Sequence, residues 1–106
     1  MTFPEEIKTI RDRLVRFYHP DKIILFGSGA RGNAGKRSDI DMLVISDREK
    51  HLPRQRRGLD MRLRLADIKT PKDILFYTHD DVKRWETVPQ SFINRVLREG
   101  KVLYER

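Results

Sequence analysis

The sequence predicts an α/β (α+β) fold in which a single mixed β-sheet is flanked by helices. Short apolar runs typical of strands are interspersed with longer segments whose apolar residues recur at helical spacing. The chain has 106 residues, enough for one small domain with a modest core, and no repeat or linker interrupts the pattern. We therefore expect a single domain over residues 1–106, with the order helix, strand, strand, helix, strand, helix, helix, strand.

The first element is an amphipathic helix that ends at about Tyr18. Thr2 is a suitable N-cap, and Pro4 and Glu5 are typical of a first helical turn. Apolar residues then recur every three or four positions, and His19-Pro20 stops the pattern. We expect this helix to be scaffold that packs its apolar face on the sheet.

Four apolar runs are predicted as strands: 22–26, 39–45, 73–78 and 101–105. Only a short glycine-rich turn separates the first two, so we expect them to be antiparallel neighbours. The last run is expected at an edge of the sheet. Between the third and fourth runs, Thr78 and Ser91 are suitable N-caps for two further helices, the second over 92–99.

The surplus positive charge is concentrated in residues 48–64. This stretch holds seven Arg or Lys residues against two acidic ones, a balance of 7 − 2 = +5 within a chain of net charge +7. We expect a helix that begins at Pro53 and is broken by Thr70-Pro71-Lys72, and its charge favours a solvated face, docking of an acidic partner, nucleic-acid binding or steering of a polyphosphate. The apolar face expected for this helix comprises Leu52, Leu59, Leu63 and Ala66.

An acidic pair opens the second predicted strand. Asp39 and Asp41 are separated by one residue, so in an extended strand both carboxylates lie on one face. The residues that follow are apolar, and an unpaired carboxylate in such surroundings is costly. The pair is therefore a candidate cation site.

The glycine-rich turn before this pair is a candidate anion site. Glycine lets the backbone approach a phosphate closely, and a short helical turn starting at Ser28 would offer N–H donors. Magnesium is commonly bound by one or two carboxylates together with substrate phosphates. The turn and the acidic pair together could build such a site.

Three other glycine motifs do not fit. Gly27, Gly29 and Gly32 match the dinucleotide-binding spacing, but no room is left for the crossover helix that this motif opens. A P-loop would need glycine at Ala30 and a hydroxyl side chain at Arg37. The spacing of a nucleophile elbow is absent.

Gly27-Ser28, a short arginine-containing turn and Ser38-Asp39-x-Asp41 form one pattern, and an apolar strand follows it. This pattern resembles the signature of the nucleotidyltransferase fold of the DNA polymerase beta superfamily. The chain is similar, over nearly its whole length, to the minimal nucleotidyltransferases (MNT) of bacteria and archaea. The resemblance implies a polymerase beta-like fold and magnesium-dependent transfer of a nucleoside monophosphate, AMP from ATP, to a hydroxyl acceptor.

The resemblance also implies the catalytic residues. Asp39 and Asp41 would hold two Mg²⁺ ions, and the family's third carboxylate lies at the start of the strand after the intervening helix, which is Asp73 here. Asp73 would complete the second metal site and help to take the proton of the acceptor hydroxyl. Asp60 and Asp67 are weaker candidates because both fall in or beside a predicted helix.

The triphosphate contacts implied by the resemblance come from the turn. Gly27 and Ser28 would hold the β and γ phosphates through backbone N–H groups and the hydroxyl. Ser38 and Arg31 are secondary contacts, although Arg31 could equally pair with a neighbouring carboxylate.

Minimal nucleotidyltransferases are typically encoded beside a helical HEPN-domain protein, and in MNT/HEPN toxin–antitoxin pairs the former attaches AMP to a tyrosine of the latter. The resemblance implies that partner and an antitoxin role here. A chain this short has little material for an acceptor pocket, so a partner or a second copy, in a hetero- or homo-oligomer, would supply it. The alternatives are a non-catalytic antitoxin, a nucleic-acid-binding module, or one subunit of an aminoglycoside-like small-molecule adenylyltransferase.

Composition narrows the remaining classes. The chain has no cysteine, which excludes disulfides and thiolate chemistry. It shows no apolar run of transmembrane length and no signal peptide, so we expect a cytoplasmic protein that does not enter a membrane. The three histidines, His19, His51 and His79, have no metal-ligand spacing.

Overall fold

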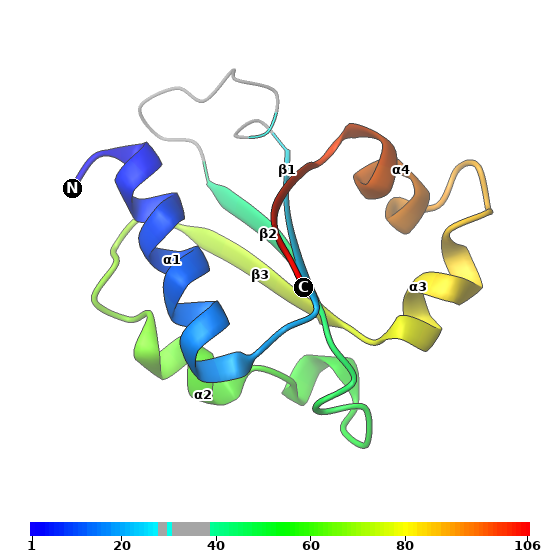
Figure 1. Cartoon of the computed structure of the whole chain (residues 1–106), viewed down its shortest axis with the longest axis horizontal. Coiled ribbons are helices and arrows are strands. Elements are labelled where there is room, and N and C mark those ends of the chain that lie inside the picture. Colours follow the sequence, from blue (N-terminus) through cyan, green and yellow to red (C-terminus); the bar gives the residue numbers. More distant parts are fainter. Residues whose placement is uncertain (28–29, 31–38) are drawn as a thin grey trace.

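A four-stranded mixed sheet forms the centre of the molecule (Figure 1). The structure, a computed structural model, describes residues 1–27, 30 and 39–106. The strand order is β3-β2-β1-β4, and β1 is antiparallel to both β2 and β4, whereas β2 and β3 are parallel. The mixed sheet and the antiparallel pairing of the first two strands confirm the sequence prediction. The strands are β1 (Lys22–Phe26), β2 (Ile40–Ile45), β3 (Lys72–Tyr77) and β4 (Lys101–Glu105).

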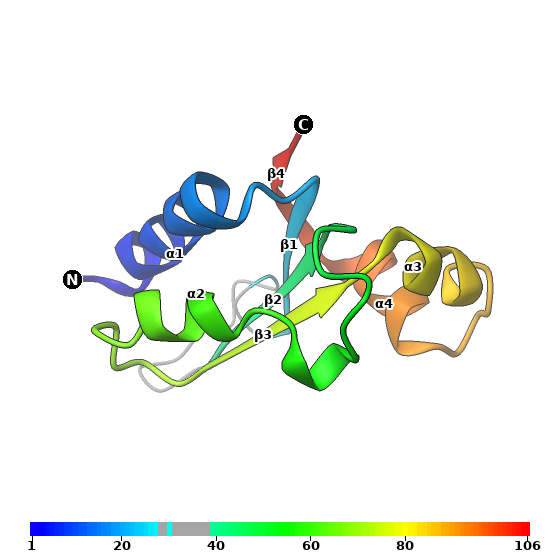
Figure 2. The ribbon, with the colours of Figure 1, turned by 90° about the horizontal axis from the view of Figure 1, so that it is seen from below.

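Helices cover both faces of the sheet, as Figures 1 and 2 show. Helices α1 (Phe3–Tyr18) and α2 (Leu59–Arg64) lie on one face, and α3 (His79–Trp85) and α4 (Phe92–Glu99) lie on the other. The core has two corresponding layers, because successive residues of a strand point to opposite faces. Met42 and Val44 of β2 belong to the α1–α2 layer, and Leu43 and Ile45 belong to the α3–α4 layer.

The ends of α1 follow from its sequence. The Thr2 hydroxyl accepts from the Glu5 backbone N–H and the Glu5 carboxylate accepts from the Thr2 N–H, which is a capping box. His19 adopts a left-handed conformation (φ 54°) and ends the helix. Ile10 and Leu14 are fully buried, so the scaffold role expected for this helix fits its packing.

The middle of the chain differs from the prediction. In place of one helix from Pro53 toward Thr70, a 3-10 turn (η1, Arg54–Arg56) precedes the short helix α2. Gly58 separates them with φ 75°, and a Cβ there would lie 2.1 Å from the Phe76 ring. The predicted apolar face was also wrong, because Leu59, Leu63 and Ala66 are exposed and Leu52 is half-buried. The buried residues are Met61 in α2 and Leu65 directly after it.

Helices α3 and α4 have the predicted caps. Thr78 forms a capping box with Asp81, which accounts for the acidic first turn of α3, and the Ser91 hydroxyl accepts from the Asn94 N–H. Helix α4 ends at Gly100, where a Cβ would lie 2.4 Å from Ile24 Cγ2, so the chain passes close to β1 before it enters β4. The described residues contain no helix long and apolar enough to cross a membrane.

Candidate active site

Three strands meet at the end of the sheet where β1 ends and β2 and β3 begin. Phe26 pairs with Asp41 across the β1–β2 ladder, and Asp41 pairs with Asp73 across the β2–β3 ladder. The Ile40 N–H donates to the Pro71 carbonyl oxygen (2.9 Å), which ties the start of β2 to the residue before β3. The register therefore brings Asp41 and Asp73, separated by 32 positions in sequence, side by side.

Asp41 and Asp73 lie on the same face of the sheet, because residues in register on neighbouring strands point to the same side. Asp39 directly precedes β2, and its charge acts on Asp41. The next residues on this side, Leu43 and Leu75, pack in the layer beneath α3 and α4. Asp41 and Asp73 thus lie on the face of the sheet that α4 covers, just beyond the edge of the apolar core.

Within the part of the chain that the structure describes, the charges that act on Asp41 are negative. Burial, then the negative charge of Asp73, then that of Asp39 raise the pKa of Asp41 above its ordinary value. Asp41 is half-buried, whereas Asp39 and Asp73 are exposed. A cation bound between these groups would remove the repulsion that raises the pKa.

Gly27 directly follows Phe26 and lies against Asp41. Its backbone has φ 74°, a left-handed conformation that favours glycine. A Cβ at this position would lie 2.4 Å from Asp41 Oδ2. The glycine therefore allows the backbone of the predicted phosphate turn to approach the carboxylate, and any larger residue would displace one of the two.

The weaker candidates for a third carboxylate are engaged elsewhere. Asp67 forms an ion pair with Arg13 (2.6 Å), whose hydrogen bond lowers the pKa of Asp67, and Asp60 pairs with Arg64 one helical turn away (2.9 Å). Asp73 is thus the carboxylate that the fold brings to Asp41. The other predicted triphosphate contacts, Ser28, Arg31 and Ser38, lie outside the described residues.

Comparison with known proteins gives the family. A family model described as Polymerase beta, Nucleotidyltransferase matches residues 8–106, nearly the whole chain. The chain belongs to this nucleotidyltransferase family. A search of curated proteins finds no match.

The fold of this nucleotidyltransferase is also found among solved structures. One match is the crystal structure, at 1.40 Å resolution, of a Sulfolobus solfataricus protein assigned as a nucleotidyltransferase. It is 23% identical in sequence, with a TM-score of 0.64, over 96% of this chain and 79% of the other. At this identity the match shows the fold alone, and it agrees with the mixed sheet flanked by helices.

The acidic edge suits magnesium by its chemistry. Its donors are carboxylate oxygens, the ligands that Mg²⁺ prefers. Across residues 1–27, 30 and 39–106, no three His, Cys, Asp or Glu side chains come close enough to hold one ion among them. A magnesium ion at this edge would therefore need ligands besides the described side chains, and substrate phosphates are a common source of them.

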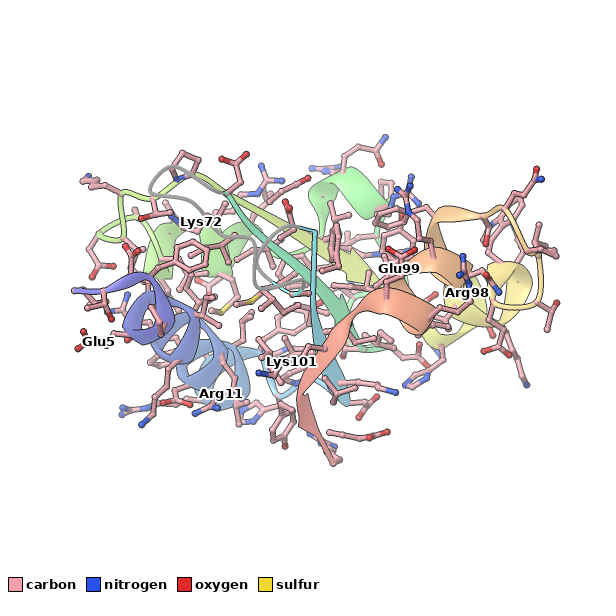
Figure 3. The ribbon with its side chains drawn as sticks, turned by 90° about the horizontal axis from the view of Figure 1, so that it is seen from above. Glu5, Arg11, Lys72, Arg98, Glu99 and Lys101 are labelled. Carbon is pink, nitrogen blue, oxygen red and sulfur yellow. The ribbon has the colours of Figure 1, made fainter. Side chains whose placement is uncertain are left out.

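A cavity of about 270 Å³ lies beside Gly27, between the end of β1 and α4. Its lining residues are Phe26, Gly27, Arg95, Val96 and Glu99. Figure 3 shows Glu99 at the end of α4 and Lys72 at the start of β3 on opposite sides of the central strands. Sequence reasoning missed Arg95, and no motif marks it, because only the packing of α4 on β1 brings it to Gly27.

A second cavity of about 360 Å³, between α2 and β3, also includes Asp73 in its lining. Most of its other lining residues, including Met61, Leu65 and Phe76, belong to the α1–α2 layer. This cavity therefore lies mainly on the α1–α2 side of the sheet and reaches the acidic edge at Asp73. Lys72, which also lines this cavity, donates from Nζ to the carbonyl oxygen of Ile68.

Most arginines of the basic stretch 48–64 contact other parts of the protein. Arg48 donates to the Phe17 and Tyr18 carbonyl oxygens (3.0 Å each), and Arg54 stacks over the Tyr77 ring at 4.8 Å. Arg57 is buried and Arg64 pairs with Asp60. The exposed cations that remain in the stretch are Lys50, Arg56 and Arg62.

Proposed function

We propose that this chain is a magnesium-dependent nucleotidyltransferase that transfers AMP from ATP to a hydroxyl group of a protein. The observation that carries the proposal is the row of carboxylates at one sheet edge, with Gly27 held against Asp41. Membership of the nucleotidyltransferase family supports the reaction class. The choice of ATP and of the acceptor goes further than the family and belongs to the proposal.

Each residue has a role in this reaction. Asp39 and Asp41 would hold magnesium, and Asp73 would complete a second metal position. Bound magnesium neutralises charge on the triphosphate and lowers the pKa of the acceptor hydroxyl. The Gly27 backbone, together with Ser28 and secondary contacts from Arg31 and Ser38, would bind the β and γ phosphates.

The chemical step is a displacement at the α-phosphorus of ATP. The acceptor oxygen forms a bond to this phosphorus, the bond to the bridging oxygen of the β-phosphate breaks, and pyrophosphate leaves. The exposed carboxylate of Asp73 can take the proton of the acceptor hydroxyl, since it lies at the rim of the site.

For the acceptor we propose a tyrosine of a HEPN-domain toxin encoded beside this chain, which would make the chain its antitoxin. The proposal rests on the similarity to minimal nucleotidyltransferases. Nucleic acid is a weaker alternative, since four of the arginines in the basic stretch contact the protein itself.

Label transfer tests the proposal. The purified chain is incubated with Mg²⁺ and ATP labelled at the α-phosphate, with and without the protein encoded next to it. We expect label on the neighbouring protein, and loss of that label with Asp39→Asn. Tight binding of the two proteins without any transfer would contradict the proposal and favour an antitoxin that acts by occlusion. Transfer to an aminoglycoside in place of the protein would assign a small-molecule acceptor.

A further inference from the structure

Helix α4 places a cation beside the predicted phosphate turn. Arg95 lines the 270 Å³ cavity together with Gly27, and Gly27 in turn lies against the Asp41 carboxylate. The cavity therefore borders the candidate metal site on the same face of the sheet. A triphosphate held by Gly27 would carry its negative charge to this cavity.

The position of α4 is fixed by its packing. Phe92 forms an edge-on contact with Phe26 (5.3 Å between ring centroids), and Val96 is buried against the sheet. At the end of the helix, Gly100 packs on Ile24. With these contacts on either side of it, Arg95 is held close to the end of β1 while its side chain remains exposed.

The packing leaves the Arg95 guanidinium available to an anion. Among the described residues, Arg95 is in none of the ion pairs, which include those of Arg13, Arg57 and Arg64. Guanidinium groups bind phosphate oxygens through paired, charge-assisted hydrogen bonds. A cation at this position would therefore favour ligands with several phosphates.

We propose that Arg95 contacts the β or γ phosphate of the bound nucleoside triphosphate and makes the site selective for a triphosphate over a monophosphate. The proposal deepens the function proposed above and rests on it. It assigns to α4, an element outside the glycine turn and the acidic row, a direct part in substrate binding.

Glu99 lies one helical turn beyond Arg95 and lines the same cavity. Its carboxylate would repel a polyphosphate, so the two residues are expected to act in opposite directions. Replacing Glu99 by Gln should therefore increase ATP affinity. Glu99 therefore tests whether the charge of the residues that line this cavity controls ATP affinity.

Calorimetric titration of the full chain with ATP and with AMP, both in Mg²⁺, tests the proposal. Arg95→Ala should weaken ATP binding by about tenfold or more, because it removes a charge-assisted contact, and should leave AMP binding unchanged. Arg95→Lys should recover part of the loss. The matched control is Arg98→Ala on the same helix, where the Arg98 Nε donates to Asn94 Oδ1 (2.8 Å), and it should bind ATP as the parent does.

These titrations distinguish failure of the Arg95 inference from failure of the proposed function. If the parent binds ATP and Arg95→Ala binds it equally well, the inference about Arg95 is wrong and the proposed function stands. Equal weakening of ATP and AMP, or equal weakening by Arg98→Ala, would also overturn it. If the parent binds no ATP in Mg²⁺, the proposed function and this inference fall together.

Discussion

Asp41 is the residue on which the site depends most closely. It has two carboxylate neighbours, Asp39 just before β2 and Asp73 on β3, and the Gly27 backbone lies against its Oδ2 atom. Burial and the two neighbouring carboxylates raise its pKa. A cation bound beside Asp41 would therefore stabilise the ionised carboxylate.

Asp41→Asn tests this directly. Because the folded-state pKa of Asp41 is raised, its ionisation destabilises the metal-free fold: the stability contribution is complete below the ordinary pKa of 3.8 and is lost as pH rises through the raised value. Asp41→Asn should therefore be slightly more stable than the parent in EDTA at pH 7, by on the order of 1 kcal/mol or less. Mg²⁺ should stabilise the parent and not the variant, as measured by thermal unfolding.

The control for this prediction is Asp60→Asn, which removes a carboxylate paired with Arg64 on α2. Mg²⁺ should stabilise this control as it does the parent. Equal stabilisation of Asp41→Asn by Mg²⁺ would contradict the metal assignment.

Gly27→Ala should reduce activity by displacing the Gly27 backbone or the Asp41 carboxylate. The left-handed φ costs roughly 1–2 kcal/mol for a residue with a Cβ, and the new Cβ would meet Asp41 Oδ2 at 2.4 Å. We expect AMP transfer to fall by about 100-fold, since small displacements of catalytic groups have effects of that order.

Gly58→Ala is the matched control for Gly27→Ala. It has a similar φ of 75°, but its Cβ would meet the Phe76 ring, away from the carboxylates. It should therefore destabilise the fold while the folded fraction keeps its Mg²⁺ response. A Gly27→Ala protein that transfers AMP at the parent rate would show that the contact with Asp41 does not matter.

At the scale of elements, strand pairing and capping were predictable from the sequence. Short apolar runs and the turn between them identified β1 and β2, and Thr78 and Ser91 identified the helix starts. The parallel register of β2 and β3 was not predictable, because it depends on the crossover through α2. The side of α2 that is buried was also missed, since the left-handed Gly58 breaks the helix that spacing alone would continue.

Arg57 shows how tertiary contacts override a charge pattern. It lies in the basic stretch, yet it is buried, donates to the Leu52 and Phe76 carbonyl oxygens, and pairs with Asp81 (2.9 Å). It links the segment before α2 to the end of β3 and the start of α3. No feature of the sequence separates it from its exposed neighbour Arg56.

Arg57→Ala should lower the free energy of unfolding by about 2–3 kcal/mol, because buried acceptors lose a charged donor. Burial raises the pKa of Asp81, but the Thr78 N–H and Arg57 outweigh it, and the pKa is lowered overall. The stabilisation is therefore present above pH 3.8 and lost as pH falls through the lowered value. Urea unfolding at pH 7 and at acidic pH measures this, and Arg56→Ala should have little effect; equal losses for both variants would contradict the assignment.

At the scale of the whole molecule, the two faces of the sheet differ in role. One face packs against scaffold helices, and the other borders the candidate carboxylates. Helices α1 and α2 bury the Met42–Val44 side, and α4 lies beside the carboxylate edge on the opposite side. The positive charge of residues 48–64 is weak evidence for nucleic-acid binding, because several arginines of this stretch hold elements of the fold together.

We therefore expect duplex DNA to bind only nonspecifically, with a Kd of about 10⁻⁶ M or weaker at physiological salt. Fluorescence anisotropy over a range of salt concentrations measures this for the parent and for a Lys50→Ala, Arg56→Ala, Arg62→Ala triple variant. The triple variant should keep Mg²⁺-dependent stabilisation. Nanomolar DNA binding that the triple variant abolishes would assign the basic stretch to nucleic acid.

The most direct test of the account is a crystal structure of the chain with Mn²⁺ and a non-hydrolysable ATP analogue, in which anomalous scattering locates the metal. We expect metal bound by Asp39 and Asp41, with Asp73 at a second position and the β and γ phosphates against Gly27. Metal bound without Asp41, or a nucleotide seated in the cavity between α2 and β3, would contradict it.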